Sequence, residues 1–321
     1  MKKRLFASLL SLVMLLALFP TVALAAGSGT SEDPYVVANV SELSEKLSSA
    51  TTVSTTYIKL SDDFASDGGN NILTFPQGTD IVLIGNDQKI TGSFAMQIYG
   101  SARVENLTLE PTAKNGPVTI GSATSSGTPT ITFESCTIAH IPNGRPSSSD
   151  VASTIAVNCS STFKPVVTLT NCTVTTTGHT SLTNVGGTAH TVAINVSADS
   201  GVDCARSKLV LDDTDVTAIT TSPSRTYGMD IWGDGVAVEI KNGSTIAADK
   251  YYGYGITLND KNADVTITDS TVNAWGCLVF FNSASGNEVN ITGSSRLVAK
   301  TPMAMAKITT RPLFLGALTI R

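Results

Sequence analysis

Several aspartates stand close together in the second half of the chain, in a pattern that suits carbohydrate chemistry. Asp212, Asp213 and Asp215 fall within four residues, and Asp230 follows one predicted strand later. Paired carboxylates cleave glycosidic bonds, one as a general acid and the other as a base or nucleophile, and grouped carboxylates also bind calcium. One hypothesis from these residues is therefore a polysaccharide-cleaving groove, with calcium as the cofactor that this set would favour.

The same aspartates also fit a purely structural role. The position of Asp212 and Asp213 within a repeated phrase is held by Asn171, Asn242 and Asp269 in other copies. Asn and Asp favour tight turns because their side chains bond to their own backbone. We therefore favour corner residues over catalytic groups at this position, and we expect neither a cofactor nor a metal site.

Aromatic residues begin a second set of short segments, and a row of stacked rings can bind the apolar face of a sugar. These residues are His190, Tyr227, Tyr254 and Trp275. Alternation along an extended strand puts Tyr227 on the same side as Met229 and Ile231, so we favour stacking inside the core. Trp232 and Phe280 have the opposite parity, and we predict them to be exposed ligand-binding residues.

A repeated phrase must position these residues. It alternates apolar and other residues and then breaks at Asn, Asp, Ser or Gly, as in VTLTNCTV at 167–174 and VTITDSTV at 265–272. Copies begin about 24 to 42 residues apart, which is the length of one coil in a stacked solenoid. The pattern predicts an all-β fold, a right-handed parallel β-helix with at least two strands in each coil.

The start of the chain has the features of a secretory signal. Residues 1–25 combine the basic Lys2–Arg4, an apolar run and an Ala-Leu-Ala cleavage site. We assign residues 26–55 to an N-terminal segment with a capping helix and residues 56–321 to the β-helix domain. No second long apolar stretch follows, so we expect a secreted or cell-surface protein without a membrane span after signal removal.

The two ends of the predicted solenoid differ. Asn39 followed by Glu42 resembles a capping box, and the helix that they begin would cover the open sheet edge of the first coil. After Lys300 no comparable cap follows. This predicts either a truncated C-terminus or self-association through the uncapped end.

Composition restricts the partners. The chain has a net charge of −5 and only 15% charged residues, and after residue 25 it has no cluster of Lys or Arg. Nucleic acid and anionic membranes attract basic patches, so neither is an expected partner. Extracellular polysaccharide, or a host or cell-wall surface, fits better.

The cysteines could form disulfides or remain free thiols. Cys136 and Cys172 occupy the same position in successive copies of the phrase. Stacked coils would bring them about 4.8 Å apart, which leaves a disulfide open. Because in-register side chains on parallel strands point the same way, we favour a buried ladder of free thiols.

The opening GSGTSEDPY, the short helix, the segment TYIKLSDDF at 56–64 and the repeated phrases resemble bacterial secreted or surface proteins of the right-handed parallel β-helix, pectate-lyase-like superfamily. The resemblance covers nearly all of the chain after the signal. It implies the fold and the compartment. It leaves the activity open, because this architecture carries lyases, hydrolases, adhesins and plain scaffolds.

A fainter resemblance links residues 228–249 to polygalacturonase-type glycoside hydrolases. It implies that Asp249 matches the last residue of that family's aspartate pair, whereas Ala248 stands at the partner position. The family's Asn-Thr-Asp is replaced by Arg225, Thr226 and Tyr227. One carboxylate of the required set is therefore kept.

These patterns favour a non-catalytic extracellular or cell-surface protein, an adhesin-like or glycan-contacting module. One alternative is a divergent polysaccharide lyase or glycoside hydrolase that acts on acidic polysaccharide. Its catalytic candidates are Asp212, Asp213, Asp215, Asp230 and Asp249. The other alternative is a passive structural stalk.

Overall fold

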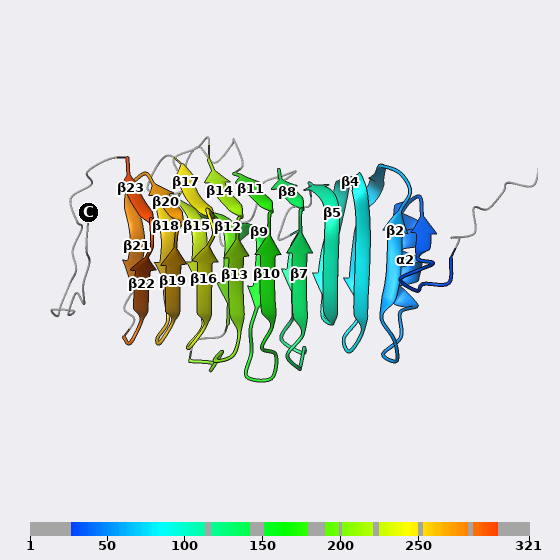
Figure 1. Ribbon diagram of the computed structural model, residues 1–321, viewed down its shortest axis with the longest axis horizontal. Coiled ribbons are helices and arrows are strands. Elements are labelled where there is room, and N and C mark those ends of the chain that lie inside the picture. Colours follow the sequence, from blue (N-terminus) through cyan, green and yellow to red (C-terminus); the bar gives the residue numbers. More distant parts are fainter. Residues whose placement is uncertain are drawn as a thin grey trace, which may run out of the picture.

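The computed structural model describes residues 27–112, 117–141, 151–178, 190–198, 201–220, 225–249, 253–281 and 285–300. All strand pairings among them are parallel, and each strand pairs with its counterparts in the coils before and after it. Figure 1 shows the coils stacked in sequence order along the long axis. The predicted all-β parallel β-helix is confirmed, with three strand ladders where the sequence indicated at least two.

The first ladder contains β1 (Tyr35–Val37), β2 (Thr56–Leu60), the start of β4 (Asp80–Ile98), the start of β5 (Ser101–Pro111), β7 (Thr130–Glu134), β10 (Val166–Thr170), β13 (Lys208–Asp212), β16 (Ala237–Lys241), β19 (Asp264–Thr268) and β22 (Glu288–Thr292). β1 lies before residue 56, so this ladder begins within the N-terminal segment.

The second ladder contains the start of β3 (Phe64–Phe75), the middle of β4, the end of β5, β8 (Thr137–His140), β11 (Thr173–Thr177), β14 (Asp215–Ile219), β17 (Thr245–Asp249), β20 (Thr271–Ala274) and β23 (Arg296–Ala299). The third ladder contains the ends of β3 and β4, β6 (Val118–Ile120), β9 (Val151–Asn158), β12 (His190–Ser197), β15 (Arg225–Ile231), β18 (Gly253–Leu258) and β21 (Cys277–Phe281).

The core follows from the alternation of the repeated phrase. Leu169 of β10 pairs with Phe133 on one side and Leu211 on the other, and all three side chains are fully buried. Removing each such side chain from water contributes about 1.5–3 kcal/mol. Strand pairing in register therefore builds continuous apolar rows through the solenoid.

The corner between the first and second ladders uses one backbone conformation in six successive coils. A residue there has a φ between 49° and 56°, in the left-handed region where Asn and Asp cost least. These residues are Asn106, Ser135, Asn171, Asp213, Asn242 and Asp269. The predicted corner role is confirmed for Asp213, whereas Asp212 is the last residue of β13.

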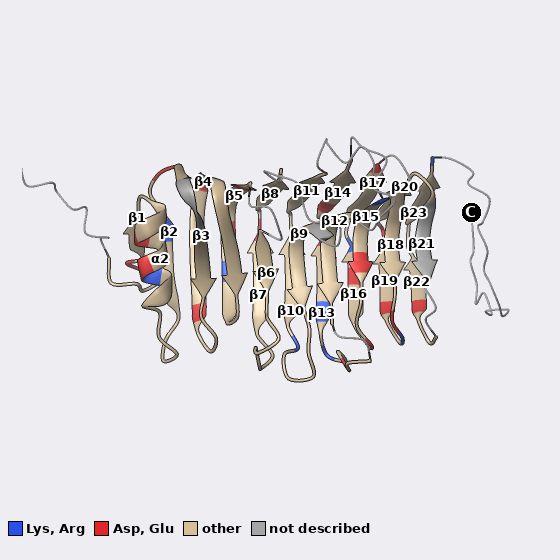
Figure 2. Cartoon of the chain, turned by 180° about the vertical axis from the view of Figure 1, so that it is seen from behind, with Lys and Arg blue, Asp and Glu red and all other residues tan. Residues whose placement is uncertain are grey.

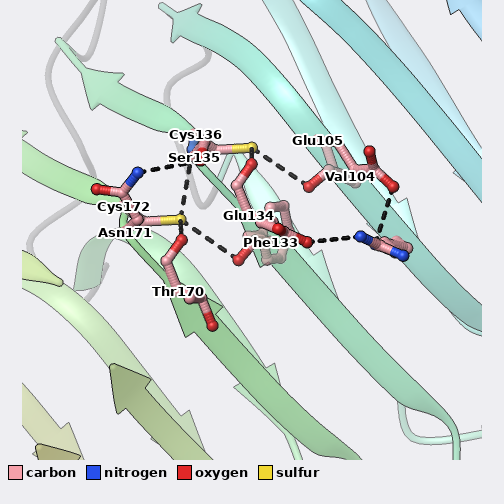
Figure 3. A network of polar contacts seen from close by, with 10 residues as sticks. Val104, Glu105, Phe133, Glu134, Ser135, Cys136, Thr170, Asn171 and Cys172 are labelled. Carbon is pink, nitrogen blue, oxygen red and sulfur yellow. Dashed lines mark hydrogen bonds and ion pairs between the residues drawn. The ribbon is translucent and has the colours of Figure 1, made fainter. Parts of the chain in front are cut away.

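The first thiol or hydroxyl side chain after the corner, in five successive coils, belongs to what we call the polar row: Cys136, Cys172, Thr214, Ser244 and Ser270. The backbone N–H of Cys136 donates to Cys172 Sγ at 3.5 Å, and that of Cys172 donates to Thr214 Oγ1 at 3.3 Å. Thr214 N–H in turn donates to Ser244 Oγ at 3.0 Å. Figure 3 shows both thiols lying over neighbouring carbonyls, with Cys136 Sγ 3.4 Å from Val104 O. Both cysteines are free thiols, as the sequence favoured.

A nine-residue helix, α2 (Val40–Ser48), lies at the N-terminal end of the solenoid (Figure 1). Asn39 Oδ1 accepts the Glu42 N–H at 2.9 Å, and Glu42 Oε2 accepts the Ala38 N–H at 2.9 Å. Leu43 and Leu47 are fully buried against the first coils. The predicted capping helix is confirmed.

At the other end, the last described coil is less well covered. Val289, Ile291 and Leu297 pack against the core but stay partly exposed. The expectations about truncation and self-association concern residues 301–321, which lie outside the described part. Among the described residues, no helix is long and apolar enough to span a membrane.

Candidate functional site

The corner aspartates have structural partners. Asp212 Oδ1 accepts a hydrogen bond from Asn242 Nδ2 at 2.7 Å, and its Oδ2 lies 3.4 Å from Lys241 Nζ. Asp213 has a φ of 49° at the corner, and Asp215 opens β14 with an exposed side chain. Asp212 therefore links its coil to the next one. The aspartates that the sequence analysis grouped as catalytic candidates at 212–215 lie at or beside a corner of the solenoid.

The other two catalytic candidates lie on different ladders. Asp249 ends β17 in the second ladder, where its Oδ1 is 3.2 Å from Lys300 Nζ. Asp230 lies in β15 of the third ladder. The geometry thus does not bring the predicted carboxylates into one groove. Among the described residues, no three His, Cys, Asp or Glu side chains gather in a way that could hold a metal ion.

Charged residues are sparse along the strands, as Figure 2 shows. On the first ladder they pair across coils. Across neighbouring coils, Arg103 contacts Glu134 at 2.7 Å and Lys208 contacts Glu239 at 2.6 Å. Arg103 also contacts Glu105 of its own strand, β5, at 2.8 Å. The two pairs between coils are half-exposed; they hold neighbouring coils in register and add little stability each.

The third ladder contains a kink that reverses the direction of its aromatic residues. A Cβ at Gly228 would come within 2.5 Å of Ile246 Cγ2, a core atom, so position 228 faces inward. The next residue, Met229, is also in the core. Alternation therefore fails here, and Tyr227 lies on the outer side together with the exposed Arg225. Tyr227 thus lies outside the main apolar cluster, although it is buried and stacked as the sequence analysis expected.

The stack of rings exists, although its register differs from the expectation. The Tyr227 and Tyr254 ring centroids are 5.1 Å apart with planes only 13° from parallel, and His190 lies 5.1 Å from Tyr227 at a tilt of 41°. By backbone register, however, Tyr227 pairs with Val192, and Tyr254 pairs with Cys277 in place of Trp275. His190 thus reaches the stack diagonally.

Burial alters the electrostatics of this stack. Tyr227 is only 6% exposed, and burial raises its pKa to about 12, although a hydrogen bond with Arg225 partly opposes the shift. Burial, together with the charge of Arg225, lowers the pKa of His190. Burial thus favours the neutral forms of Tyr227 and His190, and Arg225 forms the charged border of the stack.

A second group on the same outer side joins a carboxylate to an exposed indole. Asp230 is 7% exposed, and its Oδ2 accepts the Trp232 indole N–H at 3.0 Å. Its Oδ1 accepts a hydrogen bond from Asn259 Nδ2 at 2.6 Å. Trp232 remains 41% exposed. Asp230 thereby fixes the edge of the indole and leaves the ring to solvent, and we call these three residues the Trp232 cluster.

Residues that pair with Asp230 in backbone register continue this cluster along the third ladder. Asn195 and Thr257 pair with Asp230 in the coils before and after it, and Thr257 Oγ1 is buried without a hydrogen-bond partner. The predicted exposure of Trp232 is confirmed. Phe280 pairs with Thr257 by backbone register, and its side chain lies outside the described part.

Asn259 was not singled out from sequence, although the coil length contained the necessary information. Tyr227 and Tyr254 are 27 residues apart, and the same offset takes Trp232 to Asn259. A constant offset within one ladder thus identifies the partner of Asp230 as a close neighbour of Trp232.

The buried carboxylate of Asp230 predicts a pH dependence of stability. Burial raises its pKa, and the hydrogen bonds from Trp232 and Asn259 only partly oppose the shift. The folded state therefore holds this proton more tightly than the unfolded state, whose value is about 3.9. Its contribution to stability is present at low pH and is lost as pH rises through the raised pKa.

We expect Asp230→Asn to gain stability relative to the unchanged protein as pH rises from about 4 to 7. Thermal unfolding across that range measures the difference. Asp215→Asn, at an exposed aspartate, is the matched control and should leave the two curves parallel. Parallel curves for Asp230→Asn as well would contradict the burial argument.

One open hollow lies elsewhere, at the N-terminal end. It has a volume of about 310 Å³ and is lined mainly by hydroxyl side chains, with the rings of Tyr35 and Tyr57. No residue of the Trp232 cluster or of the aromatic stack lines it.

Comparisons with known proteins return structural likeness only. No protein-family profile matches the chain, and no curated protein matches its sequence. Among solved structures, the SRRP of L. reuteri 53608 matches with a TM-score of 0.32 and 15% identity, over 82% of this chain and 99% of that one. A candidate immunoglobulin A1 protease from Bacteroides ovatus matches with a TM-score of 0.32 and 12% identity, over 85% of each chain. Neither likeness bears on activity.

Proposed function

We propose that the protein is an extracellular, non-catalytic interaction module that contacts glycans through the outer side of its third ladder. The observation that carries this proposal is the Trp232 cluster. An exposed indole whose edge is fixed by a buried carboxylate presents a rigid apolar face, and sugars stack on such faces through their own apolar side. Preorganisation of this kind lowers the entropy cost of binding.

Neighbouring groups support the same use. Asn195 pairs with Asp230 by backbone register, and Asn259 donates to the Asp230 carboxyl. Both are half-buried polar side chains whose chemical groups suit sugar hydroxyls. The stack formed by His190, Tyr227 and Tyr254 lies near the starts of the same strands, and its half-buried members His190 and Tyr254 would add aromatic surface there, whereas Tyr227 is buried between them. An extended chain of sugars would meet both groups.

The test is binding of the purified protein to arrayed plant, bacterial and host polysaccharides, followed by the variant Trp232→Ala. We expect at least a tenfold weaker affinity for the variant, as for a truncated aromatic hot spot. Val53→Ala is the matched control, because Val53 is an exposed apolar residue at the N-terminal end. It should bind like the unchanged protein.

Other results would overturn the proposal. Absence of binding to every polysaccharide favours the structural stalk. Release of new sugar ends, abolished by Asp213→Asn, favours the enzyme. Binding that survives Trp232→Ala places the contact elsewhere on the solenoid.

A further inference from the structure

Two pairs of buried thiols lie in adjacent coils, and they differ in geometry. Cys136 and Cys172 share the polar row. Cys159 directly follows β9, whereas Cys204 lies in the connection between β12 and β13, one coil further on. All four sulfurs belong to the apolar core and are free thiols.

In the first pair, the two cysteines occupy equivalent positions, which keeps their side chains parallel and apart. Cys136 and Cys172 occupy the same position on parallel coils, so their Cα–Cβ bonds point the same way and their Cβ atoms stay about 4.8 Å apart. Disulfides need Cβ atoms at roughly 3.5–4.5 Å. Each sulfur also contacts carbonyl oxygens, Cys136 Sγ that of Glu134 at 3.4 Å and Cys172 Sγ that of Thr170 at 3.3 Å.

The second pair is not equivalent, so its side chains need not point the same way. The Cys159 N–H donates to Ser197 O at 2.7 Å, which fixes it at the entrance of the connection. The Cys204 N–H donates to Asp234 O at 2.7 Å, near the end of its own connection. Cys204 Sγ is buried, and a Cβ at Gly233 would stand 3.2 Å from it and 3.5 Å from Ala198 Cβ. Ala198 and Cys159 directly follow the paired residues Ser197 and Asn158, so Cys204 Sγ lies beside the coil position stacked on Cys159.

We propose that Cys159 and Cys204 form a disulfide that joins adjacent coils when the protein folds in the presence of a low-molecular-weight disulfide. The thiolate of Cys159 attacks the small disulfide and releases one small thiol. Cys204 then displaces the second small thiol from Cys159. Two protein thiols are oxidised, one small disulfide is reduced to two thiols, and their protons pass from the cysteines to the small thiolates.

Local electrostatics favours this order of attack. A hydrogen bond from Cys204 is the main cause that lowers the pKa of Cys159, and the charge of Lys164 acts in the same direction. The same hydrogen bond, together with burial, raises the pKa of Cys204. Cys159 is therefore the better nucleophile of the two.

The inference rests on the extracellular location in the proposed function, since disulfides persist in oxidising compartments. Its test is independent of glycan binding. The reduced, unfolded full chain is refolded with oxidised and reduced glutathione, quenched with acid, alkylated in denaturant and mapped by mass spectrometry. We expect a peptide linking Cys159 to Cys204, with Cys136 and Cys172 alkylated.

The bond closes a loop of about 45 residues, so the oxidised protein should melt about 5 °C or more above the reduced one. The variant Cys159→Ser/Cys204→Ser should lose this redox-dependent difference, and Cys136→Ser/Cys172→Ser should keep it. Refolded protein with Cys159 and Cys204 both alkylated overturns the inference. So does a link between Cys136 and Cys172, or a link from either member of the second pair to Cys277.

Discussion

Replacing Gly228 with valine should lower the free energy of unfolding by about 3 kcal/mol, the upper part of the range for overpacked cores. A Cβ at this position would lie 2.5 Å from Ile246 Cγ2 and 2.7 Å from the carbonyl oxygen of Gly255. The first contact involves a packed core side chain and the second involves backbone. Neither can move without disturbing the neighbouring strand.

The same change should disturb the outer side of the third ladder. The kink at Gly228 turns Tyr227 outward, so a displaced strand would also separate the rings of Tyr227 and Tyr254. Urea unfolding measures the loss of stability, and near-ultraviolet circular dichroism reports the stacked tyrosines. Both signals are expected to change together.

Ala237→Val provides the control for Gly228→Val. Ala237 is a half-buried residue at the start of β16, outside the kink, where a larger β-branched side chain should change stability by less than about 0.5 kcal/mol. A Gly228→Val protein as stable as this control would mean that the kink does not depend on the missing side chain.

Much of the fold was predictable because the repeated phrase encodes it locally. Alternating Val, Ile and Leu identified inward positions such as Leu169, and the Asn or Asp that interrupts the alternation in most copies identified the corner at Asp213. Both signals depend on neighbours within a few residues. The capping helix was predictable for the same reason, since Asn39 and Glu42 are three residues apart.

The candidate site was less predictable because it depends on distances between coils. Parity identifies the outward side only while a strand is regular, and the kink at Gly228 broke that rule for Tyr227. Alignment by the first aromatic residue of each segment placed His190 and Trp275 two residues away from their true register. Connection lengths differ from coil to coil, and a single sequence does not reveal where the extra residues are accommodated.

The corner aspartates illustrate the opposite error. Their residue type suggests catalysis, but their contacts in the structure join neighbouring strands. Asp212 binds Asn242 and Lys241 of the next coil, so its acceptor capacity is used between strands. The carboxylate whose surroundings are unusual is Asp230, which the sequence placed in the same group. Burial and two side-chain donors separate it from the others.

Replacing Thr214 with valine should destabilise the protein by about 2–3 kcal/mol, although the two side chains have nearly the same shape. Thr214 is 1% exposed, and its hydroxyl donates toward the carbonyl oxygens of Leu169 at 3.0 Å and Asp212 at 3.1 Å. The same oxygen accepts the Cys172 N–H at 3.3 Å. Valine leaves that buried donor without a partner.

The variant Thr214→Ser separates the contribution of the hydroxyl to stability from that of the methyl group. It keeps the hydrogen bonds and removes one methyl, so it should cost only about 1 kcal/mol. The polar row already accepts serine at Ser244 and Ser270. Unfolding in urea under reducing conditions gives the two free energies, and hydrogen exchange at the Cys172 amide gives a local readout. If the valine and serine variants have equal stability and equal exchange, the row is held by packing alone, and its succession of Cys, Thr and Ser requires another explanation.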